Sequence, residues 1–315
     1  MPVLQSNYRP PAYLFNGHLQ TLAPVFGVKR NNSLYTTEKL ELPDGDFLEL
    51  DWVRGGNDQL MILIHGLEGN SRSHYVQQMA EHFSAIGWDI LVMHARSCGR
   101  EMNRLPVLYH GGSTDDIAVL LKEYAQKYNS IVLTGFSLGG NMALNFVARH
   151  TTPQNLKAVA AFSAPCDLKT SEQKIDRFTN RIYANKFLLK LKAKVRKLEN
   201  LHPGIFDIKT LDEIKSVQAF SANFTAPFSG FKSLDDFYLS GSSLNSLSEV
   251  RMPTLIVNAQ NDPFLSKPCF PIALAKKSDH LFLDMPKQGG HAAFPITKTK
   301  SWMPARLEQF LENIL

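Results

Sequence analysis

Short, wholly apolar segments alternate with stretches of helical periodicity along most of the chain, and this alternation constrains the fold more than any other feature. Residues 60–64 are all apolar, which is typical of a strand buried on both faces of a parallel sheet. Residues 75–86 then show helical spacing, and residues 89–93 return to a strand pattern. Repeated units of this kind predict an α/β fold, with a mostly parallel central sheet flanked by helices.

The same alternation continues through the middle of the chain and returns near its end. An Asp44-Gly45 dipeptide between residues 38–42 and 47–53 predicts a β-hairpin ahead of the first buried strand. Residues 8–26 are aromatic and Pro-rich, and we expect them to be irregular. Further strands are predicted at residues 130–134, 156–162, 254–258 and 281–284, and helices at 115–127, 138–149 and 302–315.

One long segment interrupts the pattern. Residues 168–250 contain no clear buried strand and consist of helix-like stretches rich in Lys and Phe. We therefore predict a single α/β domain spanning residues 1–315, with residues 168–250 inserted as a mainly helical cap of ordinary small-domain size. The cap is expected over the carboxyl ends of the strands, where open α/β sheets bind ligands.

Composition excludes several other classes of protein. Of the 315 residues, 44% are hydrophobic and 20% charged, which argues against disorder, collagen and coiled coil. The three cysteines lie far apart and form no C-x-x-C pair, so neither a secreted disulfide scaffold nor a structural zinc site is expected. The net charge of +5 is a mild excess and does not indicate a nucleic-acid partner.

Targeting signals are also absent from the sequence. The first eleven residues hold two adjacent prolines and no apolar core of the kind a signal peptide needs. No stretch approaches the roughly 20 apolar residues of a membrane span. A cytoplasmic protein is therefore expected.

Ser137 is the strongest candidate for a catalytic residue. It lies in Gly135-Phe136-Ser137-Leu138-Gly139-Gly140, directly after an apolar strand and directly before a helix. A serine at such a turn is exposed in strained backbone geometry, and its glycines avoid clashes with the neighbouring strand and helix. The alternative interpretation is a glycine-rich turn with an incidental serine.

A serine nucleophile needs a base, and the base needs an orienting carboxylate. Asp262 follows the strand at residues 254–258, and His291 follows the strand at 281–284 within Gly289-Gly290-His291. The chain order Ser, Asp, His is the order found in α/β-hydrolases. The alternatives are an Asx turn for Asp262 and a loop histidine satisfied by water for His291.

The oxyanion of an acyl-transfer intermediate needs two backbone donors. We assign them to the amides of Leu67, in the loop after residues 60–64, and Leu138, at the start of the helix. His65 is expected to be structural, bonded within its own loop. A minority alternative makes His65 the general base instead.

Other polar clusters are interpreted as structural. The loop holding Arg96 and Cys98 is expected to line the site or simply to shape its own loop, with Cys98 an inert thiol. Asp115 and Asp116 open a helix after Ser113 and Thr114, either of which suits an N-cap. We favour this interpretation over a metal site, and no metal or cofactor is expected.

A basic run lies inside the predicted cap. In residues 186–198 the apolar Leu188, Leu191, Val195 and Leu198 recur at helical spacing among lysines and Arg196. The favoured interpretation is a cap helix with a solvated basic face, and the alternative is peripheral contact of that face with anionic lipid. Aromatic residues nearby suit either an acyl pocket or the core of the cap: Phe178, Tyr183, Phe187, Phe220, Phe224, Phe228 and Phe231.

Taken together, these residues resemble the YheT-like hydrolases of the α/β-hydrolase superfamily over nearly the whole chain. The resemblance implies a triad on Ser137, Asp262 and His291, and carboxylesterase or acylglycerol lipase activity, with acyl transfer to alcohols in some members. The motifs that carry the resemblance are Phe15-Asn16-Gly17-His18-Leu19-Gln20-Thr21-Leu22, Asp51-Trp52-Val53, His65-Gly66-Leu67-Glu68-Gly69, Tyr109-His110-Gly111-Gly112-Ser113-Thr114-Asp115-Asp116, Gly135-Phe136-Ser137-Leu138-Gly139-Gly140-Asn141 and Asp176-Arg177-Phe178-Thr179.

We therefore predict a serine hydrolase that cleaves small-molecule or acylglycerol-like carboxylic esters through an acyl-enzyme. An acyltransferase or a thioesterase would need the same triad and differs only in the acyl donor or acceptor. A non-catalytic protein of the same fold, which binds an apolar ligand or a partner, is the alternative from another class.

Overall fold

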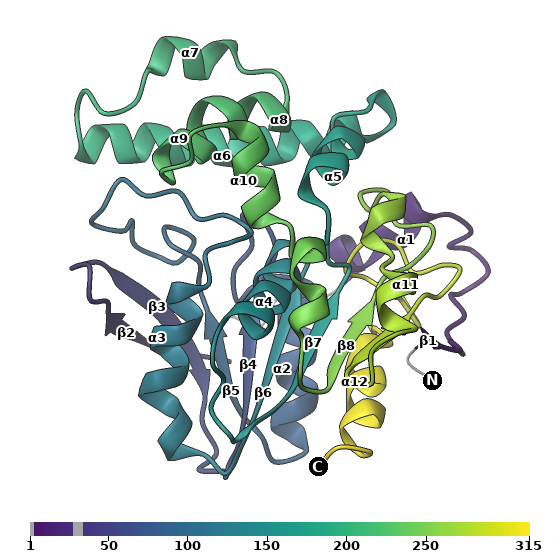
Figure 1. Ribbon diagram of the computed structural model, residues 1–315. Coiled ribbons are helices and arrows are strands. Elements are labelled where there is room, and N and C mark those ends of the chain that lie inside the picture. The colour runs from purple at the N-terminus through teal and green to yellow at the C-terminus, as the bar shows by residue number, and fades with distance from the viewer. Residues whose placement is uncertain (1–2, 28–33) are drawn as a thin grey trace.

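The computed structural model describes residues 3–27 and 34–315, and within them a single sheet of nine strands forms the centre of the molecule (Figure 1). Its order is β1-β9-β8-β7-β6-β4-β5-β3-β2. All neighbouring strands are parallel except the pairs β2–β3 and β3–β5. The strands are β1 (Val3–Leu4), β2 (Thr36–Glu41), β3 (Phe47–Val53), β4 (Gln59–Ile64), β5 (Asp89–Met93), β6 (Ser130–Phe136), β7 (Leu156–Phe162), β8 (Thr254–Val257) and β9 (Leu281–Asp284).

Two apolar cores lie on the two faces of this sheet. Successive side chains of β4 alternate between them, so that Leu60 and Ile62 pack into one core while Met61 and Leu63 pack into the other. The first core is closed by α3 (Asp115–Tyr124) and α4 (Leu138–Arg149), and the second by α2 (His74–Ala85) and α12 (Met303–Leu311). Burial on both faces explains why the central strands are apolar throughout.

The predicted elements of the sheet are confirmed, with small differences at their ends. The helix predicted at residues 115–127 ends its α-helical part at Tyr124 and continues as a 3-10 turn, Ala125–Lys127. The terminal helix is shorter than expected, Met303–Leu311. Thr114 occupies the N-cap position of α3, but its hydroxyl bonds to His150 Nε2 at 2.8 Å rather than to the helix.

The expectation that residues 8–26 are irregular is confirmed for residues 8–16 and is wrong for the residues that follow. Gly17–Gly27 forms helix α1, which contains Pro24 and has four buried residues, among them Gln20 and Thr21. Hydrophobic periodicity does not indicate this helix, because it contains a proline and its buried face is polar. That face packs on the loops that follow β8 and β9 rather than on an apolar core.

The segment between β7 and β8 is helical and contains no strand in residues 168–250, all of which the structure describes. Figure 1 shows its helices over one end of the sheet. Leu188 and Val195 of its longest helix pack with Phe220 and Phe224 in a separate apolar cluster. The helices are α5 (Leu168–Ile175), α6 (Arg181–Leu201), α7 (Ile208–Glu213), α8 (Val217–Phe220), α9 (Ala226–Phe228) and α10 (Leu234–Gly241), and a short α11 (Ile272–Ala275) follows β8.

Hydropathy sets one further limit. Among the helices of residues 3–27 and 34–315, none is both long enough and apolar enough to cross a bilayer.

Candidate active site

Ser137 occupies a sharp turn between β6 and α4. Its backbone has φ 53° and ψ −123°, a conformation that is strained for a residue with a side chain. Glycines make the turn sterically feasible, because a Cβ on Gly139 would lie 2.4 Å from the carbonyl oxygen of His65, and a Cβ on Gly66 would lie 2.9 Å from Cβ of Ser137. The serine side chain is therefore held against the end of β4.

The structure brings the three residues predicted as a triad into one hydrogen-bonded chain. His291 Nε2 lies 2.8 Å from Ser137 Oγ, and His291 Nδ1 lies 2.8 Å from Asp262 Oδ2. Asp262 is fully buried and the imidazole is only 10% exposed. Because Nδ1 donates to the carboxylate, Nε2 is left as the acceptor that faces the serine hydroxyl.

Asp262 also makes the Asx turn that was its alternative interpretation. Its Oδ1 accepts the N–H groups of Phe264 at 2.8 Å and Leu265 at 3.3 Å, while Oδ2 remains for His291. Lys174 of α5 donates to the carbonyl oxygen of Asp262 at 2.8 Å. The turn and the lysine fix the direction in which the carboxylate points.

Helix α1 supports the loop that carries His291, a contribution that the sequence did not reveal. Thr21 Oγ1 accepts the His291 N–H at 3.0 Å, and Gln20 Oε1 accepts the Gly289 N–H at 2.8 Å. Gly290 has φ 64°, and a Cβ there would lie 2.7 Å from the Thr21 nitrogen. The only signal in the sequence was the motif near the start of the chain that contains Gln20 and Thr21. It contributed to the family resemblance but indicated no function for either residue.

Among the residues that the structure describes, no acceptor pairs with the amides of Leu67 and Leu138, whereas three amides close to them are bonded. Gly66 donates to Tyr75 Oη at 3.1 Å, Glu68 donates to Tyr109 Oη at 2.7 Å, and Ser137 donates to Phe162 O at 2.8 Å. Leu67 and Leu138 line the same cavity as Ser137 and His291. Both amides are thus available to a ligand at the serine.

His65 cannot serve as the base in this geometry. Its Nδ1 donates to Gly66 O at 2.8 Å, and its Nε2 accepts the Ala95 N–H at 3.1 Å, so both ring nitrogens are engaged. Burial lowers the pKa of His65 to about 3, so that the ring is neutral. The ring therefore joins the end of β4 to the loop after β5.

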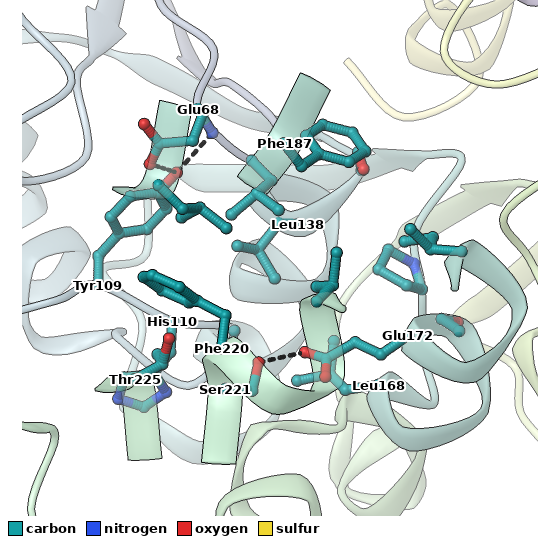
Figure 2. Close-up of a pocket in the computed structure, with 18 of the residues that line it drawn as sticks. Glu68, Tyr109, His110, Leu138, Leu168, Glu172, Phe187, Phe220, Ser221 and Thr225 are labelled. Atoms are coloured by element: carbon teal, nitrogen blue, oxygen red, sulfur yellow. Dashed lines mark hydrogen bonds between the residues drawn. The ribbon is translucent and has the colours of Figure 1, made fainter. Parts of the chain in front are cut away.

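The cavity beside Ser137 lies between the sheet and the helices of residues 168–250. Apolar side chains from both parts dominate its wall, and Figure 2 shows Leu138, Leu168, Phe187 and Phe220 around it. Phe187 and Phe220 therefore belong to the pocket, whereas Phe178 is 84% exposed on the surface of the cap.

Two glutamates, Glu68 and Glu172, line this mainly apolar cavity. Glu172 of α5 accepts hydrogen bonds from Tyr238 Oη at 2.6 Å and from Ser221 Oγ at 2.9 Å, the second of which is drawn in Figure 2. Burial raises the pKa of Glu172 to about 7, although both hydrogen bonds act to lower it. Sequence reasoning missed this residue, because a single glutamate in a helix carries no pattern.

Two other polar groups singled out in the sequence, around Arg96 and Cys98, are engaged or buried within the fold. Arg96 pairs with Asp116 at 2.7 Å and with Asp44 at 2.6 Å, which ties the start of α3 to the β2–β3 turn. Cys98 is buried and forms no disulfide, and burial raises the pKa of its thiol.

One group of side chains within the described residues has the donor types of a metal site. Glu49, Asp51 and His94 are buried and close together. Arg100 lies 3.0 Å from Glu49 Oε1 and 2.8 Å from Asp51 Oδ1, and Ser71 donates to Asp51 Oδ2 at 2.5 Å. Burial alone would raise the pKa of Asp51, but hydrogen bonds from His94, Arg100 and Ser71 lower it far below its usual range. Both carboxylates are thus already engaged by donors of the protein itself.

Comparison with known proteins identifies the family. YheT of Escherichia coli K12, an esterase by name, is 28% identical over 95% of this chain and 91% of its own length. Phospholipase ABHD3 of the mouse is 26% identical over 93% of this chain and 74% of its own length. The esterase Pf2001 of Pyrococcus furiosus shares the fold at a TM-score of 0.60 and 15% identity, with 99% of this chain and 98% of that chain covered. The sequence profile of the alpha/beta hydrolase fold matches residues 59–296, and the chain therefore belongs to the α/β-hydrolase fold family.

Proposed function

We propose that this protein is a serine hydrolase that cleaves carboxylic esters through an acyl-enzyme. The observation that carries the proposal is the chain of two 2.8 Å contacts from Ser137 Oγ through His291 to Asp262. A serine hydroxyl becomes a nucleophile when a base takes its proton as it attacks. Esterase and phospholipase names among the relatives support the same chemistry.

Each residue of the triad has one role in this mechanism. His291 Nε2 removes the proton from Ser137 as Oγ attacks the ester carbonyl, and later gives the proton to the leaving alcohol. Asp262 holds the imidazole in the tautomer with a proton on Nδ1 and stabilises the imidazolium. Water, activated by the same histidine, then hydrolyses the acyl-enzyme.

The oxyanion of the tetrahedral intermediate binds to the Leu67 and Leu138 amides. Within residues 3–27 and 34–315 neither amide has another acceptor, and Leu138 N–H lies at the positive end of α4, which favours negative charge. In related chemistry each such donor is worth about 3 kcal/mol of transition-state stabilisation.

The cavity indicates an ester with an apolar acyl chain, such as a small-molecule ester or an acylglycerol-like lipid. The wall that surrounds Ser137 is mainly aliphatic and aromatic, and residues 168–250, which we regard as a cap, contribute more than half of the residues that line it. A pocket of this kind stabilises a bound acyl chain in proportion to the apolar surface area that the chain buries.

Peripheral contact with anionic lipid is a second part of the proposal. Residues 177–198 contain eight Lys and Arg and no Asp or Glu. On the outer face of α6, Ile182 is 80% exposed and Leu189 is 71% exposed. Exposed apolar side chains beside lysine and arginine are typical of a helix that rests on a lipid surface. We also propose a cytoplasmic location, with which three free cysteines agree.

The test combines covalent labelling with turnover. A fluorophosphonate probe is expected to label the wild-type protein and not Ser137→Ala, and p-nitrophenyl esters of short and medium chain length are expected to be hydrolysed only by the former. Labelling of Ser137→Ala at the wild-type level would exclude the assignment. Folded protein that turns over no ester would favour the ligand-binding alternative. Analysis of the products with added alcohol would identify acyl transfer, and assay of a thioester substrate would identify thioester cleavage.

A further inference from the structure

Lys194 is the one buried basic residue of α6, whereas Lys186, Lys190, Arg196 and Lys197 are exposed, as the predicted solvated basic face requires. Its side chain is only 5% exposed, and Nζ lies 2.6 Å from Glu68 Oε1, whose side chain is 7% exposed. Nζ also lies 3.0 Å from Cys98 Sγ and 4.6 Å from the centre of the Tyr109 ring. A buried ammonium is unfavourable unless it is paired, so this contact is specific and not incidental.

Glu68 immediately follows Leu67, and its conformation depends on groups from elsewhere in the chain. Its φ is 53°, in the left-handed region that disfavours a residue with a side chain. The N–H of Glu68 donates to Tyr109 Oη at 2.7 Å, and its carbonyl oxygen accepts Lys190 Nζ at 2.8 Å. Figure 2 shows Glu68 against Tyr109, with Phe187 of α6 nearby. Strain of this kind persists only where the surroundings hold it.

The rest of the loop is held by the core rather than by the cap. Gly66 N–H donates to Tyr75 Oη at 3.1 Å, and Gly69 N–H donates to Gly66 O at 2.9 Å. The cap therefore contacts the part of the loop that presents the free Leu67 amide. The two cap lysines that contact this loop, Lys190 and Lys194, both come from helix α6.

We infer that Lys194 is a positioning residue, which pairs with Glu68 and so holds the Leu67 amide in place for the oxyanion at Ser137. This inference rests on the proposed function. With this role for Lys194, the oxyanion site is complete only while α6 contacts the loop that contains Leu67. Movement of the cap therefore changes the rate of the chemical step as well as access to the cavity.

A double-mutant design separates this role from simple support of the fold. Lys194→Met leaves the Glu68 carboxylate buried without its partner, whereas Lys194→Met combined with Glu68→Gln leaves no buried charge. The double variant is therefore expected to regain much of the melting temperature that the single variant loses. Its kcat is expected to stay about 10- to 100-fold below wild type, with KM within about twofold, because no ion pair fixes the loop. Arg196→Met, on the same helix at an exposed pair with Asp212, is the matched control with unchanged kcat.

An inhibitor that forms an oxyanion gives a second readout. A trifluoromethyl ketone with the acyl chain of the best substrate adds to Ser137 and binds the oxyanion donors, whereas the corresponding secondary alcohol does not. Lys194→Met is expected to weaken binding of the ketone by the same factor as kcat and to leave binding of the alcohol unchanged.

The outcomes are distinct. A double variant whose kcat recovers together with its melting temperature, or a Lys194→Met enzyme with wild-type kcat, would overturn the positioning role and leave the proposed function intact. Wild-type protein that hydrolyses no ester and forms no adduct at Ser137 would overturn both.

Discussion

Thr21 accepts a hydrogen bond from the backbone N–H of His291 at 3.0 Å, although 270 positions separate the two residues in the chain. The contact joins helix α1 to the loop that presents the imidazole to Ser137. It fixes the backbone of the histidine itself, one residue after a glycine with φ 64° that packs directly on α1.

Thr21→Val is expected to lower kcat by about tenfold, because the His291 N–H loses its acceptor and the imidazole loses its position relative to Ser137. Valine keeps the shape of threonine, so the packing of α1 is retained. Steady-state kinetics with one p-nitrophenyl ester, together with the melting temperature, measure the effect. Unchanged kcat in the folded variant would show that the other contacts suffice to place the loop.

Gly66→Ala is expected to lower kcat/KM by at least about tenfold, because the new Cβ would lie 2.9 Å from Cβ of Ser137 and would displace the serine or the loop. Gly45→Ala is the control, since its Cβ would meet no atom within 4 Å and its φ of 85° introduces only local strain. The control is expected to lose about 1 kcal/mol of stability and no activity. Equal activity of the two variants would contradict the close approach.

Glu172 is expected to make stability depend on pH. Its pKa is raised to about 7 in the folded protein from the ordinary glutamate value of 4.5, so its stabilising contribution is complete below about pH 4.5 and is lost as pH rises through 7. Over this window the wild-type protein loses up to about 3 kcal/mol relative to Glu172→Gln, which does not titrate. Denaturant unfolding of both proteins at pH 5 and pH 8 measures the difference. If the two proteins differ in free energy of unfolding by the same amount at pH 5 and at pH 8, the raised pKa of Glu172 is excluded.

Ile182→Glu combined with Leu189→Glu is expected to weaken binding to vesicles that contain anionic phospholipid by at least about tenfold, since it replaces apolar area with charge of the wrong sign. Ile86→Glu is the matched control, an exposed isoleucine that follows α2 in the hydrolase core rather than the cap. Vesicle sedimentation provides the measurement, and turnover of a water-soluble ester is expected to remain normal. Equal binding of the double variant and the control would contradict the lipid-facing role of α6.

The sequence alone determined the sheet, the turn at Ser137 and the loops of Asp262 and His291. These features depend on local chemistry: wholly apolar runs mark strands buried on both faces, and glycines mark the sharp turns between a strand and the next element. Because parallel strands end at the same edge of a sheet, residues that follow β6, β8 and β9 were expected to lie near one another. Their roles in catalysis remain proposals for the experiments above.

The groups that support the site could be identified only from the three-dimensional fold. Helix α1, the burial of Lys194 and the carboxyl of Glu172 could not be predicted, because each depends on a partner far away in the chain. Helical spacing identified the apolar face of α6 correctly, yet it could not distinguish the one lysine that meets a buried carboxylate from its solvated neighbours. A periodic pattern reports the average environment of a helix face, whereas the pairing of a single charge is determined by what the fold places opposite it.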